Sequence, residues 1–264
     1  MADGAIEVLA FRSPDAIWAG MRNRSVPVLR PEEADYVRSF VVHDDDAVLA
    51  FNKPSGLAVQ TRGGRGRSLD HLLWAFAKSN GKRPRLVHRL DTGTSGIMVV
   101  GRTQPAAAHL SDSFAKRRAR KTYVALARGD LPDDGAGTID QPLLKCEGQR
   151  GVPPMVASDD PAALAASTHW RILARAGDTA LFELRPKTGR MHQIRAHLRH
   201  LNCPILGDPL YGAGGLSGAR LMLHAARLVI AHPQGDDLDL SAPIPADMAA
   251  AIEIAGLEAP AESA

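Results

Sequence analysis

Residues 88–96 read His-Arg-Leu-Asp-Thr-Gly-Thr-Ser-Gly, and an apolar run at 97–100 follows them directly. Four consecutive apolar residues bounded by glycine are typical of a buried strand. The polar string therefore predicts a loop that leads into an interior strand. Asp91 is its only acid, and a polar side chain in a loop on a rigid support is well placed for chemistry. Asp91 is accordingly the first candidate for a catalytic residue.

The triplet Asp91-Thr92-Gly93 has two other interpretations. Its commonest use is structural, with the aspartate accepting backbone N–H bonds in a tight turn. Aspartic proteases also use Asp-Thr-Gly, but they pair it with a second carboxylate that shares one proton. This chain has one Asp-Thr-Gly, and Arg89 stands where a protease would need an apolar strand. The protease interpretation is therefore disfavoured, whereas the turn and the catalytic loop stay open.

Outward from this loop, strands and helices alternate along the chain. Ser68 and Thr103 are suited to begin helices, because short hydroxyl side chains accept N–H bonds at helix N-termini. Pro245 suits the first turn of a closing helix. The apolar patterns predict strands at 47–51, 97–100, 121–127, 167–173, 179–185 and 228–231, and helices at 68–81, from 104, at 190–201 and at 246–254. Stretches with glycine and proline at 128–165 and 207–220 indicate insertions within one domain.

The predicted helix 190–201 places its apolar residues on one face. They are Met191, Ile194, Leu198 and Leu201. Arg190 and Arg195 fall on either side of this face, so both can border a cleft while the helix stays anchored in the core.

The composition excludes several classes of protein. Hydrophobic residues make up 45% and charged residues 23% of the 264 residues, which is ordinary for a folded globular protein rather than a disordered one. No apolar run approaches the length of a membrane helix, which needs about 20 residues. The N-terminus, MADGAIEVLAF, carries acids where a secretory signal would carry Lys or Arg. A cytoplasmic location is therefore expected.

Neither the cysteines nor the histidines form a disulfide or metal pattern. Cys146 and Cys203 stand apart, without the spacing of a zinc site or a disulfide framework. His192, His197 and His200 share one predicted helix, but that helix has no acid to complete a ligand set. No metal and no cofactor are expected.

Positive charge is concentrated in one stretch of the chain. Residues 61–121 hold 14 Lys and Arg against 3 Asp and Glu, although the net charge of the whole chain is only +3. Five of the six residues at 116–121 are basic. Clustered cations release counterions from phosphates, which favours binding to a polyanion. An unevenly charged, solvated surface is the other interpretation.

Three long motifs follow one another along the chain. They are His88-Arg89-Leu90-Asp91-Thr92-Gly93-Thr94-Ser95-Gly96, Lys121-Thr122-Tyr123-Val124-Ala125-Leu126 and Thr188-Gly189-Arg190-Met191-His192-Gln193-Ile194-Arg195-Ala196-His197. Shorter segments accompany them: Asn52-Lys53-Pro54-Ser55-Gly56-Leu57, Pro204-Ile205-Leu206-Gly207-Asp208, Tyr211-Gly212, Leu223-His224-Ala225 and His232-Pro233. In this order the motifs resemble those of the RluA family of pseudouridine synthases, and the resemblance covers most of the chain.

The resemblance implies an α+β fold, with a mixed, largely antiparallel central sheet flanked by helices and a central RNA-binding cleft. It also implies isomerisation of a uridine in structured RNA to pseudouridine, without cofactor or metal. Asp91 would be the nucleophile, Arg195 its ion-pair partner, and Tyr123 the residue that packs on the uracil and assists proton removal from C5. Because an isomerisation adds no atom, the lack of a phosphate-binding or dinucleotide motif in the sequence agrees with it.

By the same resemblance, the basic stretch and the helix of Arg195 would hold the RNA. Arg89 would fill the space left by the extruded uridine, since its planar guanidinium both stacks and donates hydrogen bonds. The other expected RNA-binding residues are His88, Arg62, Arg65, Arg67, Lys116, Arg117, Arg118, Lys121, Arg190, His192 and Gln193. Ribosomal RNA and transfer RNA are both candidate substrates. The alternative is a non-catalytic RNA-binding or chaperone module of the same fold, which would be expected to lose Asp91, Tyr123 or Arg195, whereas all three are present.

One catalytic domain is expected at 41–255, after an N-terminal extension at 1–40 and before a flexible tail at 256–264. The extension is too short and too acidic for the small basic RNA-binding domain that several family members carry. The chain thus resembles the single-domain members. We expect a monomer that binds structured RNA, without a membrane or an obligate protein partner.

Overall fold

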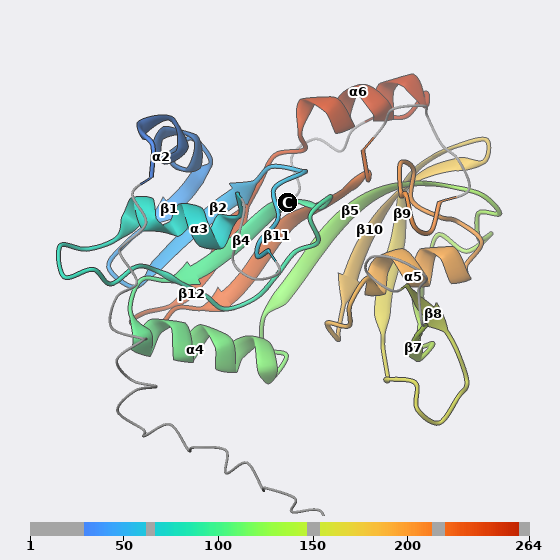
Figure 1. Ribbon diagram of the computed structural model, residues 1–264. Coiled ribbons are helices and arrows are strands. Elements are labelled where there is room, and N and C mark those ends of the chain that lie inside the picture. Colours follow the sequence, from blue (N-terminus) through green and yellow to red (C-terminus); the bar gives the residue numbers. More distant parts are fainter. Residues whose placement is uncertain (1–28, 62–66, 147–153, 213–219, 259–264) are drawn as a thin grey trace, which may run out of the picture.

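The computed structural model describes residues 29–61, 67–146, 154–212 and 220–258. Its centre is a sheet of ten strands in the order β1-β2-β4-β11-β5-β10-β9-β6, with β3 added on β4 and β12 on β11 (Figure 1). The strands are β1 (Val41–Asp44), β2 (Val48–Lys53), β3 (Arg85–Leu86), β4 (Ser95–Gly101), β5 (Arg120–Arg128), β6 (Ala136–Ile139), β9 (Thr168–Ala176), β10 (Thr179–Pro186), β11 (Leu223–Ala231) and β12 (Asp237–Ser241). Neighbouring strands run antiparallel, except that β4 and β11 are parallel. This arrangement confirms the mixed, largely antiparallel sheet.

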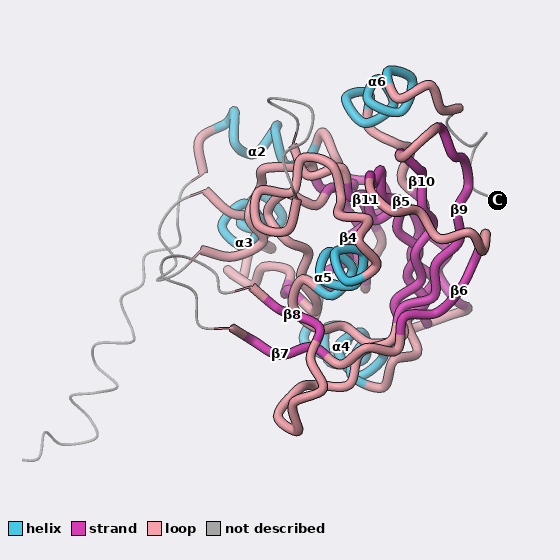
Figure 2. The backbone as a smooth tube through the Cα atoms, turned by 90° about the vertical axis from the view of Figure 1, so that its right-hand side faces the viewer, coloured by secondary structure: helices cyan, strands magenta, loops and turns pink. Residues whose placement is uncertain are grey.

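Helices flank the sheet, as expected for the α+β class. They are α2 (Pro31–Arg38), α3 (Leu69–Leu72), the 3-10 helix η2 (Leu73–Phe76), α4 (Gln104–Ala115), α5 (Gln193–His200) and α6 (Ala246–Ile254). A separate ribbon of two strands, β7 (Leu143–Lys145) and β8 (Met155–Ala157), contacts α5. Figure 2 shows this ribbon near α5 and far from α6.

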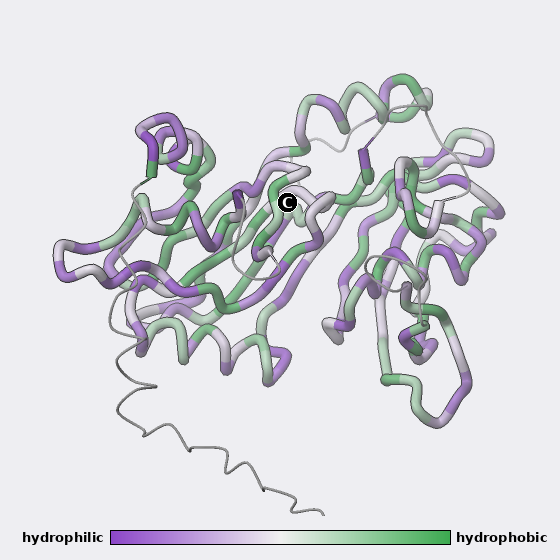
Figure 3. Tube along the Cα trace, viewed as in Figure 1, coloured by the Kyte–Doolittle hydropathy of each residue, from purple (hydrophilic) through white to green (hydrophobic). Residues whose placement is uncertain are grey.

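In the half of the sheet formed by β1, β2 and β4, helices cover both faces. Because side chains of a strand alternate between faces, Leu49 and Phe51 join the apolar cluster with α2 and α3, whereas Val48 and Ala50 join the cluster with α4. All seven residues of β4 are buried, as the apolar run in its sequence predicts. Figure 3 shows the hydrophobic stretches concentrated in the central strands. The strand behind the polar loop is therefore enclosed on both sides.

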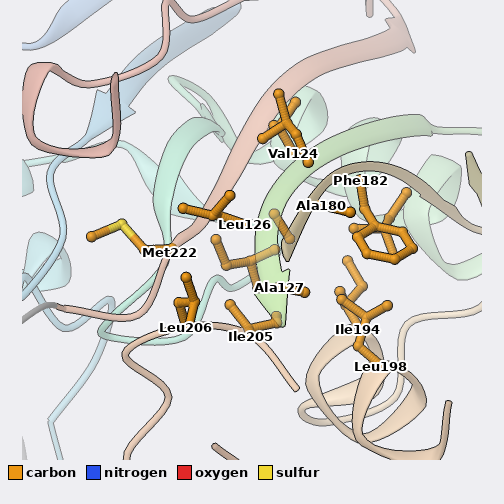
Figure 4. Packing of buried hydrophobic residues seen from close by; sticks show 14 of the residues in the cluster. Val124, Leu126, Ala127, Ala180, Phe182, Ile194, Leu198, Ile205, Leu206 and Met222 are labelled. Atoms are coloured by element: carbon orange, nitrogen blue, oxygen red, sulfur yellow. The ribbon is translucent and has the colours of Figure 1, made fainter. Parts of the chain in front are cut away.

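The other half of the sheet, β5, β10, β9 and β6, carries α5 and α6. Ile194 and Leu198 of α5 lie beside Phe182 of β10 in the largest apolar cluster (Figure 4). Met248 and Ile252 of α6 belong to the same cluster. Apolar contacts on one side of α5 thus hold this helix in place, as its periodicity predicts.

Both predicted helix caps are confirmed, but one helix is shorter than expected. Ser68 Oγ accepts the N–H of His71, and Thr103 Oγ1 accepts that of Ala106. The predicted helix 68–81 ends at Phe76, because Ala77 is extended with φ −67° and ψ 138°. The Phe76 ring packs edge-on against Phe51, with centroids 5.7 Å apart, and this contact fixes the end of the helix against the sheet.

The predicted helix 190–201 also begins later than expected. His192 adopts a left-handed conformation, with φ 52° and ψ 18°, so α5 starts only at Gln193. Met191 consequently lies outside the helix, and it is 38% exposed instead of buried. The assignment of Met191 to the core is therefore wrong, whereas Ile194 and Leu198 are buried as predicted.

The predicted division into extension, domain and tail stays a prediction. Within the extension, residues 29–40 include α2, whose Val37 is fully buried against the sheet. Residues 1–28 and 259–264 lie outside the described part of the chain. Within the described ranges, no helix has the length and apolarity that crossing a membrane requires.

Candidate active site

Asp91 lies in the loop between β3 and β4, as the sequence predicts. The loop ends at the junction of β4 with β11, where Gly96 pairs with Ala225. Gly96 has φ 113°, and a Cβ at this position would collide with the backbone of Ala225. Only glycine fits such a conformation and such a close approach. The junction therefore fixes the C-terminal side of the Asp91 loop.

The Asp91 carboxylate is held by Arg195 of α5. Nη1 of Arg195 donates to Oδ2 of Asp91 at 3.0 Å. Nε and Nη2 of the same guanidinium donate to the two carboxylate oxygens of Asp208, at 2.7 and 2.8 Å. Asp208 also accepts the backbone N–H groups of Leu210 and Tyr211. Arg195 is thus fixed between two carboxylates, and Oδ1 of Asp91 has no hydrogen-bond partner among the described residues.

The three charged side chains differ in burial. The Asp208 side chain is 0% exposed, that of Arg195 7% and that of Asp91 30%. Burial opposes the charge of Arg195, but the hydrogen bonds and negative charges of the two carboxylates outweigh it and raise the arginine's pKa. Burial would raise the pKa of Asp208, yet the bonds from Arg195 and from the backbone hold that pKa below its usual value. The Arg195–Asp208 pair therefore stays ionised at neutral pH, and Asp91 is the most exposed of the three side chains.

His192 lies beside the same carboxylate. Its Nε2 is 3.9 Å from Oδ2 of Asp91, and its Nδ1 is 3.1 Å from the Tyr211 hydroxyl. That hydroxyl also accepts the N–H of Met155 at 2.7 Å. Burial lowers the pKa of His192, against the opposing charge of Asp91. The imidazole is therefore neutral at neutral pH.

A buried lysine supports the Asp91 loop from the other side. Lys53, the last residue of β2, is fully buried, and its Nζ donates to the carbonyl oxygens of Pro54 and Leu57 at 2.9 Å and of Thr92 at 3.3 Å. Burial lowers its pKa to about 8, although Asp91 opposes the shift. Lys53 thereby ties the residue after Asp91 to the turn that follows β2.

Tyr123 comes from β5 and lies where the two halves of the sheet meet, in contact with the apolar clusters of both. Burial, together with the nearby charge of Asp91, raises the pKa of its hydroxyl. The hydroxyl therefore stays protonated at neutral pH.

A cleft of about 680 Å³ brings the three predicted catalytic residues together, since Asp91, Tyr123 and Arg195 all line it. Seven of the expected RNA-binding residues line it as well: His88, Arg89, Arg117, Lys121, Arg190, His192 and Gln193. A larger hollow of about 970 Å³ lies between the turn after β2 and α6, but none of the three residues borders it. The smaller cleft is therefore the candidate active site.

The cationic side chains of the cleft differ in how firmly the protein holds them. Arg89 and Arg117 are exposed. Lys121 is half-buried, and its Nζ donates to the Thr188 carbonyl at 3.4 Å. Nε of Arg190 donates to the Ala165 carbonyl at 3.0 Å. Arg89 and Arg117 are thus freer than Lys121 and Arg190 to move toward a ligand.

His88 and Gln193 point their polar atoms into the protein. Nε2 of His88 accepts the N–H of Val99 at 3.0 Å, its ring stacks on Phe114 at 4.3 Å, and burial lowers its pKa to about 3. The Gln193 side chain is bonded to Thr168 and to neighbouring loop residues and is 4% exposed. Both residues therefore support the walls of the cleft through contacts within the protein. Their binding of RNA stays a prediction.

The remaining expected RNA-binding residues lie away from Asp91. Arg67 stacks over the Tyr36 ring at 4.1 Å, and Lys116 and Arg118 pair with Asp112 at 3.1 and 2.5 Å. None of these borders the cleft. Arg62 and Arg65 lie outside the described residues.

Three supporting residues were not singled out from the sequence: Asp208, Lys53 and Tyr211. All three stand in the short segments that accompany the long motifs. Asp208 follows a glycine and precedes a proline, which is the pattern of an ordinary turn. Only its contact with Arg195, thirteen residues earlier, distinguishes it from one.

His192, just before α5, and His197 within it face different partners. His197 is bonded to Thr168 and to the Gln141 carbonyl, while His192 faces Tyr211. Across the described ranges, no group of three or more His, Cys, Asp or Glu side chains is placed to hold a metal ion.

Comparison with known proteins gives consistent matches. The sequence profile described as RNA pseudouridylate synthase matches residues 47–200. An uncharacterised RNA pseudouridine synthase of Chloroflexus aurantiacus is 42% identical over 205 residues, which cover 75% of this chain and 63% of that protein. The ribosomal large subunit pseudouridine synthase D of Escherichia coli K12 is 34% identical over 232 residues, which cover 81% of this chain and 69% of that protein. The structure of human RNA pseudouridylate synthase domain containing 4 matches with a TM-score of 0.73 at 28% identity, over 86% of this chain and 97% of that one.

Proposed function

Because the chain belongs to the RNA pseudouridylate synthase family and is thus a pseudouridine synthase, we propose that it isomerises a specific uridine of ribosomal RNA, with Asp91 as the nucleophile. The observation that supports this role best is the 3.0 Å bond from Arg195 to Oδ2 of Asp91 at the bottom of a cleft with cationic walls. Arg195 holds one carboxylate oxygen, which leaves Oδ1 available for a substrate.

The geometry suits the steps that the isomerisation requires. Oδ1 of Asp91 attacks C1′ of the ribose, or assists departure of the base, while the bond from C1′ to N1 breaks. The uracil then turns within the cleft, and C5 forms the new bond to C1′ while any bond from Oδ1 to C1′ breaks and the Asp91 carboxylate is released. The proton lost from C5 is balanced by the proton gained at N1, so no co-reactant is needed. The neutral Tyr123 hydroxyl relays this proton, since a phenol accepts one proton as it gives up another.

A uridine inside folded RNA must leave its stack before it reaches Asp91. Arg89 is exposed on the same loop, two residues before Asp91. Its guanidinium can stack on neighbouring bases and donate hydrogen bonds to them, so it takes the place of the extruded uridine.

The choice of ribosomal RNA follows the names of relatives such as the Escherichia coli protein, which acts on the ribosomal large subunit according to its name. Transfer RNA is the second candidate. Mapping of pseudouridine by chemical labelling, in ribosomal and transfer RNA from cells with and without the gene, distinguishes the two. A site lost only from transfer RNA would overturn the ribosomal assignment.

The nucleophile is tested with Asp91→Asn, which keeps the shape of the side chain but removes its charge. We expect tritium release from C5-labelled uridine in RNA to fall below detection, while RNA binding persists. Asp112→Asn is the control and keeps full activity, because this carboxylate pairs with Lys116 and Arg118 outside the cleft. Turnover of Asp91→Asn within about tenfold of wild type, a loss of less than 1.4 kcal/mol in transition-state stabilisation, would rule Asp91 out. A wild-type protein that binds RNA without releasing tritium would instead favour the non-catalytic RNA-binding module.

A further inference from the structure

The exposure of Met191 is unusual among the methionines of this protein. Its side chain is 38% exposed and lines the cleft that contains Asp91. The other described methionines are all buried, with exposures of 0–4%: Met98, Met155, Met222 and Met248. Scattered apolar residues on a surface need no explanation, but an exposed methionine in the cleft that holds Asp91 lies where a substrate would contact it.

The backbone on both sides of Met191 is fixed. Before it, Arg190 is held through its Nε by the Ala165 carbonyl and through its N–H by the Gln193 side chain. After it, His192 has the left-handed φ of 52° and caps α5. A non-glycine residue in this conformation is strained, and such strain persists only where the surroundings determine it. Met191 is therefore presented to the cleft by a rigid segment.

Polar and charged side chains share the cleft with Met191. His192 lies 3.9 Å from Asp91, and the exposed cations Arg89 and Arg117 border the same cleft. Cations serve the phosphates of an RNA, and the ribose presents mainly hydroxyls. The thioether of Met191 forms no favourable contact with the phosphates or with the ribose hydroxyls. The RNA surfaces that match it are the faces of the bases, which sulfur and methyl groups contact favourably.

The geometry points to Met191 as a wedge that contacts the base next to the target uridine and helps to open the stack from which that uridine leaves. Nucleic-acid-binding proteins insert methionine, leucine or phenylalanine between base steps for this purpose. This inference rests on the proposed function, because it assigns Met191 a part in presenting the uridine to Asp91. Arg89 and Met191 then have complementary roles, since the guanidinium occupies the vacated position and the thioether keeps the neighbouring base apart.

The test compares two short RNAs that carry the uridine mapped in cells. In the first the uridine is paired within a stem, and in the second the opposing nucleotide is deleted so that the uridine is already bulged. We expect Met191→Gln, which has a similar length but a polar end, to lower kcat/KM about tenfold on the paired RNA and less than about twofold on the bulged RNA, because only the paired RNA must be opened. Met191→Leu keeps the wedge apolar and stays within about twofold of wild type on both RNAs.

Ile254→Gln is the matched control, since Ile254 is 74% exposed on α6 and does not border the cleft. It leaves kcat/KM unchanged on both RNAs. A loss of the same size on paired and bulged RNA, or no loss with Met191→Gln, overturns the wedge. The proposed function survives that outcome, because the wild-type protein still forms pseudouridine.

A second measurement does not depend on catalysis. The base 2-aminopurine next to the uridine fluoresces more strongly when it is unstacked. In the Asp91→Asn protein, binding of the paired RNA raises this emission, and the added Met191→Gln change lowers the rise while overall binding is kept. An equal rise with and without Met191→Gln contradicts the wedge whether or not the wild-type protein modifies that RNA.

Discussion

The floor of the cleft, where Arg195 binds Asp91, and the rim, a basic segment at 116–118 of which Arg117 alone borders the cleft, hold their cations in opposite ways. At the floor, the Arg195 side chain is 7% exposed and donates three hydrogen bonds to Asp91 and Asp208. At the rim, Lys116 and Arg118 are 63% and 54% exposed, and both pair with Asp112, itself 42% exposed. A buried pair is little screened and has one geometry, whereas exposed pairs contribute about 0–1 kcal/mol and weaken with salt. The floor is therefore suited to chemistry, and the rim to the capture of a polyanion.

We expect the largest effect on turnover from substitution of Arg195 at the floor of the cleft. Arg195→Met removes the cation that holds Asp91 and leaves Asp208 buried without a partner. We expect kcat to fall by about 100-fold or more, since loss of one charge-positioning donor in an active site commonly costs about 2.7–4 kcal/mol. Arg195→Lys keeps the charge but not the planar fork, so it restores kcat only in part.

Single-turnover tritium release at saturating RNA measures the kcat of both Arg195 variants, and thermal unfolding checks that each is folded. A folded Arg195→Met protein with a near-normal rate would mean that Arg195 only supports the fold. The neighbouring cleft cation Arg190 would then become the candidate partner of Asp91.

A comparison of Asp208 with Asp247 tests the effect of burial, because each carboxylate receives the same two-bond contact from an arginine. Asp208→Asn loses the charged, two-oxygen partner that orients Arg195, and we expect kcat to fall about tenfold with little change in KM. Asp247→Asn is the control, because Asp247 receives the same two-bond contact from Arg220 on an exposed surface. Equal kcat values for the two variants would contradict a positioning role for Asp208.

The buried Arg195–Asp208 pair predicts that the stability of the fold depends on pH. The pKa of Asp208 is lowered on folding, so its ionisation stabilises the native state above the unfolded pKa of about 4 and ceases to do so as the pH falls through the lower folded value. Relative to wild type, Asp208→Asn should lower the free energy of unfolding by about 3 kcal/mol at pH 7, with a difference that shrinks below pH 4. Urea unfolding at pH 7 and pH 3 measures this. A difference that stays constant between the two pH values would show that the charge of Asp208 is not what matters.

The smallest effect on turnover is expected at the rim. Changing Lys116, Arg117 and Arg118 together to Gln should weaken RNA binding and flatten its salt dependence, by about 0.7–0.9 in the slope of log K against log salt for each phosphate that the variant no longer neutralises. Among the described residues Arg117 has no ion pair and borders the cleft, so Arg117→Gln alone should account for the larger share. Turnover at saturating RNA should stay the same.

Arg171→Gln on β9, far from the cleft lining, is the control for general charge. Titrations of RNA at several salt concentrations give the slopes. If the triple variant has the slope of wild type, residues 116–118 are an ordinary solvated surface.

The comparison of floor and rim also explains what the sequence could predict. The Asp91 loop was predictable because an apolar run buried on both faces follows it, and such runs have a clear local pattern. The partners of Asp91 were accessible only through the family resemblance, since Arg195 lies 104 residues away. Asp208 has no local pattern that differs from a turn.

Met191 shows where local periodicity misleads. Its spacing from Ile194 and Leu198 fits one helix face, but the left-handed conformation of His192 delays the start of the helix by three residues, from 190 to Gln193. Short edge strands such as β1 and β6 were also missed, because they are half-exposed and carry few apolar residues. Their pairing is decided by neighbours in the sheet rather than by their own sequence.

The position of β11 has a consequence for the synthesis of the protein. This strand, close to the C-terminus, lies between β4 and β5, which come more than ninety residues earlier in the chain (Figure 1). While the chain is being made, the two halves of the sheet have no shared strand until residues 223–231 have left the ribosome. Contacts between segments that are so far apart in the sequence form late and slowly in folding. Asp91 and Arg195 therefore stay on separate halves in the nascent chain, and the site assembles only after β11 has been made.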